Sequence, residues 1–163
     1  MAITIKKDGF GQVEPNHLSA QRTGQIYAQL PAAASIKVLE NGQFAKYDYA
    51  SGNVNFTAEG QEFMLVLNEV KLYDERRDSY KNFAMLKENY VNGEMVPRLF
   101  KTNVGDIFTT NCFAEGTELK IGDKLTPGTD GYLAAGEGEM VWVVVKEYTM
   151  PDGQPAVKIQ RVK

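Results

Sequence analysis

The fold class follows from one stretch of the chain, Met140-Val-Trp-Val-Val-Val-Lys-Glu-Tyr-Thr-Met-Pro-Asp-Gly-Gln-Pro-Ala-Val-Lys-Ile-Gln-Arg-Val162. Its first half is a run of β-branched and aromatic residues, and Pro151-Asp-Gly153 favours a tight turn. After the turn, apolar and polar residues alternate, which is the pattern of a half-buried strand. The stretch therefore predicts an antiparallel hairpin that closes a β-rich domain.

A period of two recurs along most of the chain. Residues 35–39 and 43–49 flank Glu40-Asn-Gly42, and Asn-Gly between alternating runs predicts a hairpin with a type I′ turn. Further short strands are predicted at residues 3–5, 54–57, 63–73, 98–100, 106–109, 117–121 and 124–125.

Together these patterns predict a mainly β protein with a single small barrel or sandwich-like domain. The domain is expected to span residues 35–163 and to end in the C-terminal hairpin. One short helix is expected at about 74–91, because Tyr80, Phe83 and Tyr90 fall at helix-like spacing.

Residues 1–34 are assigned to an extended N-terminal arm. From Asp8 to Ala34 the sequence is polar, contains several Gly and Pro residues, and has no steady period. A structureless loop of this length inside a compact domain is uncommon, which favours an arm that leaves the domain and lies on something else. A loosely ordered lead with a short helix around residues 17–30 explains the composition equally well.

Composition limits the classes of function. The chain has 163 residues, with 18 basic and 21 acidic side chains and a net charge of −3, so it lacks the basic surplus of a nucleic-acid binder. No apolar run is long enough to cross a bilayer. These features argue against nucleic acid and membrane as partners, and the lack of a long apolar leader favours a soluble protein of a reducing compartment.

Catalytic signatures are missing from the sequence. The one cysteine, Cys112, is expected to fill apolar space, and the one histidine, His17, has no second histidine or cysteine to work with. No nucleophile elbow, P-loop or zinc motif is present. We therefore expect no enzymatic activity, no catalytic residue, no metal site and no cofactor.

Two Gly-Asp frames carry a weaker signal. Residues 104–109 and 121–126 share the pattern apolar-Gly-Asp-x-apolar-Thr, which is typical of tight corners before strands rather than of a duplication. Asp123 and Asp130 lie beside glycines and could supply oxygen ligands to calcium, but their spacing is not that of an EF-hand and the turn interpretation is favoured.

The sequence resembles the head decoration (auxiliary capsid, or cement) proteins of tailed bacteriophages. The likeness lies in Ile3-Thr-Ile-Lys-Lys7, the Gly- and Gln-rich arm after it, residues 121–133 and residues 155–162. The resemblance implies a non-enzymatic virion protein, made in the bacterial host cytoplasm, that binds the major capsid protein on the outer surface of an expanded capsid, often as a homotrimer. Residues 62–90, which are longer and more helix-prone than a minimal decoration domain, depart from this pattern.

The arm is the expected contact with the capsid, because an extended segment can add a strand to a neighbouring sheet edge. The predicted contact residues are the scarce apolar and hydrogen-bonding groups of this arm: Ile3, Ile5, Phe10, Val13, His17, Gln21, Ile26 and Tyr27. An alternative is a carbohydrate- or peptide-binding β module that uses Tyr47, Tyr49 and Trp142 as a stacking face. A small hydrolase with a carboxylate pair ranks last.

Overall fold

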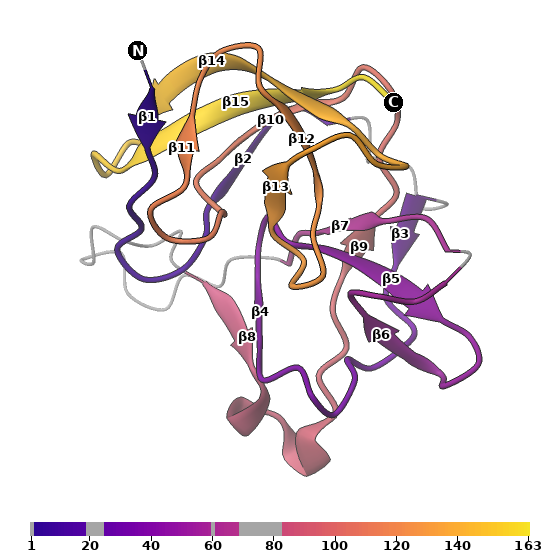
Figure 1. Ribbon diagram of the computed structural model, residues 1–163. Helices are drawn as coiled ribbons and strands as arrows, with labels where there is room; N and C mark the ends of the chain where they lie inside the picture. The colour runs from indigo at the N-terminus through magenta and orange to yellow at the C-terminus, as the bar shows by residue number, and fades with distance from the viewer. Residues whose placement is uncertain (1, 19–24, 60, 69–82) are drawn as a thin grey trace.

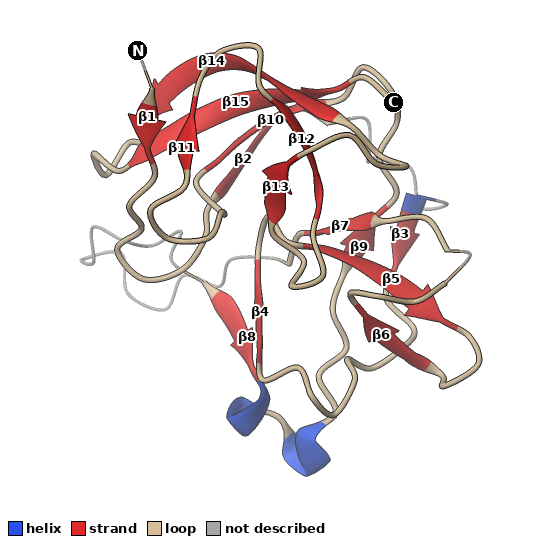
Figure 2. Ribbon diagram, in the orientation of Figure 1, coloured by secondary structure: helices blue, strands red, loops and turns tan. Residues whose placement is uncertain are grey.

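The computed structural model describes residues 2–18, 25–59, 61–68 and 83–163. The protein is mainly β, with short antiparallel strands in several sheets (Figures 1 and 2). In the described part of the chain, no helix is long and apolar enough to cross a membrane.

Among the described residues, the largest sheet has six strands in the order β13-β12-β14-β15-β10-β2. Its centre is the predicted C-terminal hairpin, which is confirmed: Val143 lies opposite Gln160, and Thr149 lies opposite Pro155. The strands are β2 (Val13–His17), β10 (Ile107–Thr110), β12 (Lys124–Pro127), β13 (Leu133–Ala135), β14 (Trp142–Thr149) and β15 (Pro155–Arg161).

The second sheet has five described strands in the order β3-β9-β7-β5-β6. Two small ribbons complete the architecture, in which β1 pairs with β11 and β4 pairs with β8. These strands are β1 (Ile3–Thr4), β3 (Ile26–Tyr27), β4 (Val38–Glu40), β5 (Phe44–Asp48), β6 (Asn53–Asn55), β7 (Met64–Val66), β8 (Ala84–Leu86), β9 (Leu99–Phe100) and β11 (Glu118–Leu119).

The two larger sheets share a hydrophobic core. Trp142 of the six-stranded sheet is fully buried, and its ring lies 5.0 Å from that of Phe108 and 5.6 Å from that of Phe44. Phe44 belongs to the five-stranded sheet, which also contributes Leu65 and Phe100 to the same cluster. This sheet-on-sheet packing is the sandwich-like arrangement expected from the alternating sequence.

The predicted helix at 74–91 is not found in the part of that range that the structure describes. Residues 84–86 form strand β8, which pairs with β4 and places Met85 in the core. Two 3₁₀ turns follow, η2 (Lys87–Asn89) and η3 (Val91–Gly93). Strand pairing thus overrides the helix-like spacing at this end, and residues 74–82 lie outside the described residues.

The predicted hairpin at Glu40-Asn-Gly42 does not form, although the chain turns there. Only Gly42 has a positive φ (104°), so the turn is not of type I′, which requires positive φ at both central residues. The flanking strands then separate, since β4 pairs with β8 whereas β5 pairs with β6 and β7. The Gly42 amide donates instead to the Val66 carbonyl.

The described parts of the N-terminal arm lie along the body of the domain. β1 pairs with β11, β2 pairs with β10 at the edge of the six-stranded sheet, and β3 pairs with β9. Figure 1 shows β2 beside β10 at the back of this sheet. Thus the three described strands of residues 1–34 pair with strands of their own chain.

Candidate functional site

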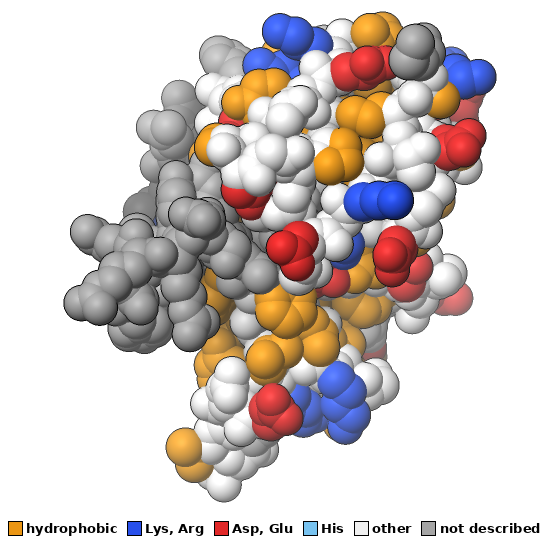
Figure 3. Space-filling view, turned by 90° about the vertical axis from the view of Figure 1, so that its left-hand side faces the viewer, with side chains coloured by type: hydrophobic (Ala, Val, Ile, Leu, Met, Phe, Trp, Pro, Cys, Tyr) orange, Lys and Arg blue, Asp and Glu red, His pale blue; other side chains and the backbone are white. Residues whose placement is uncertain are grey.

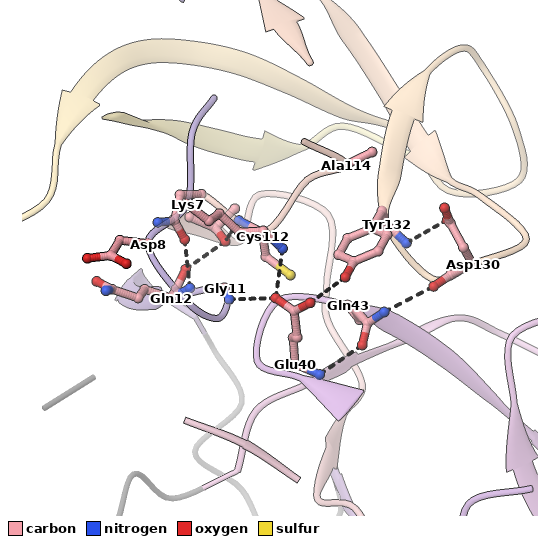
Figure 4. A network of polar contacts seen from close by, with 12 residues as sticks. Lys7, Asp8, Gly11, Gln12, Glu40, Gln43, Cys112, Ala114, Asp130 and Tyr132 are labelled. Carbon is pink, nitrogen blue, oxygen red and sulfur yellow. Dashed lines mark hydrogen bonds and ion pairs between the residues drawn. The ribbon is translucent and has the colours of Figure 1, made fainter. Parts of the chain in front are cut away.

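The densest group of converging polar side chains surrounds Glu40, at the end of β4 (Figure 4). One carboxylate oxygen, Oε2, accepts a hydrogen bond from the Gly11 amide at 2.6 Å and forms an ion pair with Lys7 Nζ at 2.8 Å. The other, Oε1, accepts from the Tyr132 hydroxyl. Only 10% of the Glu40 side chain and 11% of the Lys7 side chain are exposed. The charges are therefore held in a largely water-free place.

Lys7 and Tyr132 also contact each other. The Lys7 ammonium lies 4.8 Å from the centre of the Tyr132 ring, within the range of a cation–π interaction. Burial, together with the hydrogen bond to Glu40, raises the pKa of Tyr132 well above its ordinary value. Tyr132 is thus a neutral hydrogen-bond donor to Glu40 throughout the physiological pH range.

Hydrogen bonds of Gln43 stabilise the turn that carries Glu40. The Glu40 amide donates to Gln43 Oε1 at 2.8 Å, and Gln43 Nε2 donates to the Asp130 carbonyl at 3.0 Å. The Asp130 carboxylate in turn accepts the Tyr132 amide at 3.1 Å. These bonds orient Tyr132 toward Glu40 and tie the β12–β13 turn to the β4–β5 turn.

A second set of bonds continues the polar network toward the tip of the β14–β15 hairpin. Gln12 donates two of them, one from its amide to Asn111 Oδ1 at 2.7 Å and one from its Nε2 to Asp152 Oδ2 at 2.7 Å. Asn111 Nδ2 donates to Gln154 Oε1 at 3.0 Å, and the Asp8 amide donates to the same oxygen at 2.8 Å. Residues 7–12 are therefore bonded to three separate parts of the domain.

Cys112 lies under this polar network and is fully buried. Burial is the main reason, and the nearby Glu40 charge a further one, that the pKa of the thiol is raised far above its ordinary value. A Cβ added at Gly11 or at Gly42 would come within 2.5 Å of the Cys112 side chain. The thiol is thus a close-packed neutral group, in agreement with the predicted role as a filler of apolar space.

The polar network around Glu40 connects three chain segments, which contain Lys7 and Gly11, Glu40, and Tyr132. Both Glu40 oxygens accept hydrogen bonds from groups of the protein itself, Oε2 from Lys7 and Gly11 and Oε1 from Tyr132. The geometry fixes residues 7–12 on the body of the domain.

The two aspartates considered for calcium are engaged in turns. Asp123 Oδ2 accepts the Lys120 amide at 2.7 Å, and Asp130 Oδ1 accepts the Tyr132 amide. Over the residues that the structure describes, no three His, Cys, Asp or Glu side chains gather closely enough to hold a metal ion. The favoured turn interpretation of both aspartates agrees with these hydrogen bonds.

The eight predicted contact residues are spread over several places. Ile3 lies in the β1–β11 ribbon and packs against the core, and Ile5 beside it is fully buried, so Ile5 offers no surface to a partner in this conformation. Phe10 and Val13 are half-buried. His17 ends β2 opposite Ile107.

The remaining predicted contacts lie in another sheet or outside the described residues. Ile26 and Tyr27 form β3, where Ile26 packs against the core and the Tyr27 ring meets Tyr47 edge-on at 5.5 Å. Gln21 lies outside the described residues. The seven of these residues that the structure describes therefore lie in different sheets and ribbons and do not form one surface.

The aromatic residues of the alternative interpretation are mostly buried. Trp142 has no exposed surface and Tyr47 has 4%, whereas Tyr49 is 64% exposed. Of the three residues expected to form a stacking face, Tyr49 alone is open to a ligand, and a sugar platform requires open ring faces.

An apolar surface lies at the other end of the molecule from the β14–β15 hairpin. Figure 3 shows hydrophobic side chains gathered on the lower half of this view, bordered by charged ones. A cavity of about 560 Å³ opens between β4 and η2, lined by Lys37, Val38, Leu86, Lys87 and Glu88.

Comparison with known proteins returned no match: no family model, no curated protein and no solved structure is similar to this chain. Sequence reasoning did not predict the polar network either, because its members range from Lys7 to Gln154 and share no spacing. The one local signal was the turn predicted at Glu40-Asn-Gly42, because Glu40 is the central residue of the polar network.

Proposed function

We propose that this chain is a non-enzymatic virion protein that binds the outer surface of an expanded capsid of a tailed bacteriophage and stabilises it. Its partner is the major capsid protein, and its copies act as trimers on the shell after synthesis in the cytoplasm of the bacterial host. The proposal rests on the resemblance of residues 3–7, 121–133 and 155–162 to head decoration proteins.

The observation that carries the non-enzymatic part is the closed polar network around Glu40. In the described residues, the densest group of titratable side chains, around Glu40, holds residues 7–12 to the domain. A protein that stabilises a shell needs a rigid body and an exposed contact surface, and weak contacts repeated around a symmetric lattice raise avidity by about 10²–10⁴.

Co-sedimentation tests this function. Purified protein is mixed with expanded capsids from a panel of tailed phages lacking their own decoration protein, and the retained molar ratio is measured. We expect saturable binding at a simple fraction of the shell subunits, and no binding to unexpanded shells of the same phages. Failure of the folded protein to bind any expanded shell would contradict the proposal.

The alternative is a carbohydrate- or peptide-binding module, and the observation that favours it is exposed Tyr49. A glycan array probed with the wild-type protein and with Tyr49→Ala tests this alternative. Specific binding that the substitution abolishes would replace the capsid proposal.

A further inference from the structure

The two Gly-Asp frames form the same structure twice. In the first, the Asp106 amide donates to the Asn103 carbonyl and the Asn103 amide donates to Asp106 Oδ2, at 3.0 and 2.8 Å. In the second, the Asp123 amide donates to the Lys120 carbonyl and the Lys120 amide donates to Asp123 Oδ2, at 3.1 and 2.7 Å. Each turn has its glycine at positive φ, 97° and 93°.

Both turns dock on the central hairpin in the same way. The Gly105 amide donates to the Arg161 carbonyl and the Arg161 amide donates to the Asp106 carbonyl. Likewise, Gly122 donates to Val144, and Val144 donates to the Asp123 carbonyl.

The strands that follow the turns preserve this relation. β10 pairs with β15 and β12 pairs with β14, so the two turn–strand units flank the hairpin on opposite sides. Equivalent residues lie 17 positions apart throughout, including the directly opposed Val143 and Gln160. A local pseudo-two-fold axis therefore passes through the sheet between Val143 and Gln160.

This symmetry places equivalent residues in one row on the outer face of the sheet, with Ile107 and Val143 as its aliphatic members and Gln160 and Lys124 as its polar ones. Trp142, Val144 and Ile159 point into the core, so Val143 and Gln160 between them point outward. Directly opposed residues share a face, which places Ile107 and Lys124 on the same outer row.

Exposed aliphatic side chains flank this row. Val104 and Ile121, at the equivalent position of each turn, are 64% and 62% exposed. Val145, at the irregularity in the β14–β15 ladder, is 38% exposed. A solvent-facing sheet surface normally carries polar residues, so aliphatic side chains here favour a contact surface.

Two lysines lie on this face, and Glu14 of β2 lies in the same row, opposite Thr109, which itself lies opposite Lys158. Lys146 and Lys158 lie directly opposite each other on β14 and β15, next to Val145. Like charges in this position repel each other. Within the described part of the chain neither lysine has an ion-pair partner, although the chain as a whole carries a net charge of −3. A carboxylate from a partner would relieve the repulsion.

We infer that the outer face of β14–β15, with its two flanking turns, is the surface that docks the capsid, and that it meets an acidic patch containing aliphatic side chains. The inference rests on the proposed function and names its contact surface. Figure 1 shows the hairpin arched across the top of the molecule.

The same co-sedimentation assay tests this surface with charge-reversed variants. Lys146→Glu/Lys158→Glu keeps a like-charged pair across the strands, so folding should not change, while its attraction to an acidic partner is reversed. Lys6→Glu/Lys37→Glu is the matched control, because it makes the same change in net charge at two exposed lysines outside this face. Ile121→Asp is paired in the same way with Val91→Asp, at an exposed valine of η3.

We expect both outer-face variants to bind expanded shells about tenfold more weakly or worse, and both controls to bind like the wild type. Binding should also weaken as the salt concentration rises. Equal binding by the outer-face variants and their controls would overturn the docking surface and leave the capsid function standing. No binding of the wild type to any shell would overturn both.

Discussion

The Lys7–Glu40 ion pair gives a quantitative test of the polar network. Removing one partner of a buried pair leaves an uncompensated charge, at a cost of about 3–5 kcal/mol. Here each side chain keeps about a tenth of its exposure, so the lower end applies. We therefore expect Glu40→Gln and Lys7→Met each to lower the free energy of unfolding by about 3 kcal/mol.

The double variant separates the pair from its surroundings. Lys7→Met/Glu40→Gln leaves no unpaired charge, so its loss should fall short of the sum of the single losses by about 1–3 kcal/mol. Urea unfolding followed by tryptophan fluorescence measures these values, since Trp142 lies in the core.

The chain contains a matched control for this cycle. Lys124 and Glu137 form an ion pair at the same 2.8 Å distance, but their side chains are 52% and 66% exposed. The cycle Lys124→Met/Glu137→Gln should give a coupling of at most about 1 kcal/mol. Losses at Lys7 and Glu40 that add within about 0.5 kcal/mol, or a coupling no larger than that of the control pair, would refute the reasoning.

Other predictions concern the core, the turn, the thiol and the outer face. Trp142→Ala should cost about 3–5 kcal/mol in urea unfolding followed by circular dichroism, because it empties a fully buried site; a loss below about 1 kcal/mol would contradict the packing. Gly42→Ala should lower the thermal midpoint, since its φ is positive and the new Cβ meets Cys112; an unchanged midpoint would count against this turn. Burial raises the pKa of Cys112, so the unfolded chain loses this proton first, and stability should fall above about pH 8.5 by up to about 1.4 kcal/mol per pH unit. In Cys112→Ala the loss of stability above about pH 8.5 should be smaller. The same pH dependence as in the wild type would refute the raised pKa of Cys112 as its cause. Lys146→Glu alone should raise the free energy of unfolding by about 0.2–1 kcal/mol, because it converts a repulsive cross-strand pair into an attractive one. No gain would show that Lys146 and Lys158 do not repel each other in the folded protein.

Local pattern was enough to predict the C-terminal hairpin and most short strands. In Pro151-Asp-Gly153 the turn residues and the alternating strands on both sides favour the same structure, and β14 pairs with β15 as expected. At Glu40-Asn-Gly42 the same kind of signal was misleading. The pairing of β4 with β8 and of β5 with β7 prevented the predicted hairpin, and local residue spacing does not predict partners so far along the chain.

The helix expected at 74–91 failed at its described end for a related reason. Phe83, Leu86 and Tyr90 fit a helical spacing, but Met85 between them is buried and pairs opposite Leu39. A short apolar run fits either type of element, and its partner decides between them. The N-terminal arm shows the same dependence, since its strands are short and their partners, β11, β10 and β9, come about 75–115 residues later in the chain.

The fixed position of residues 7–12 bears on which surface is left for a partner. A segment whose backbone and side chains are bonded to Glu40, Asn111 and Gln154 would have to break those bonds before it could pair with another protein. The outer face of β14–β15 needs no such step, because its aliphatic side chains and its two opposed lysines already face solvent. A rigid, preformed surface also loses less conformational entropy on binding than an arm that must first detach. For a protein repeated many times on a lattice, that saving recurs in every copy, which favours the sheet face over the arm as the contact with the shell.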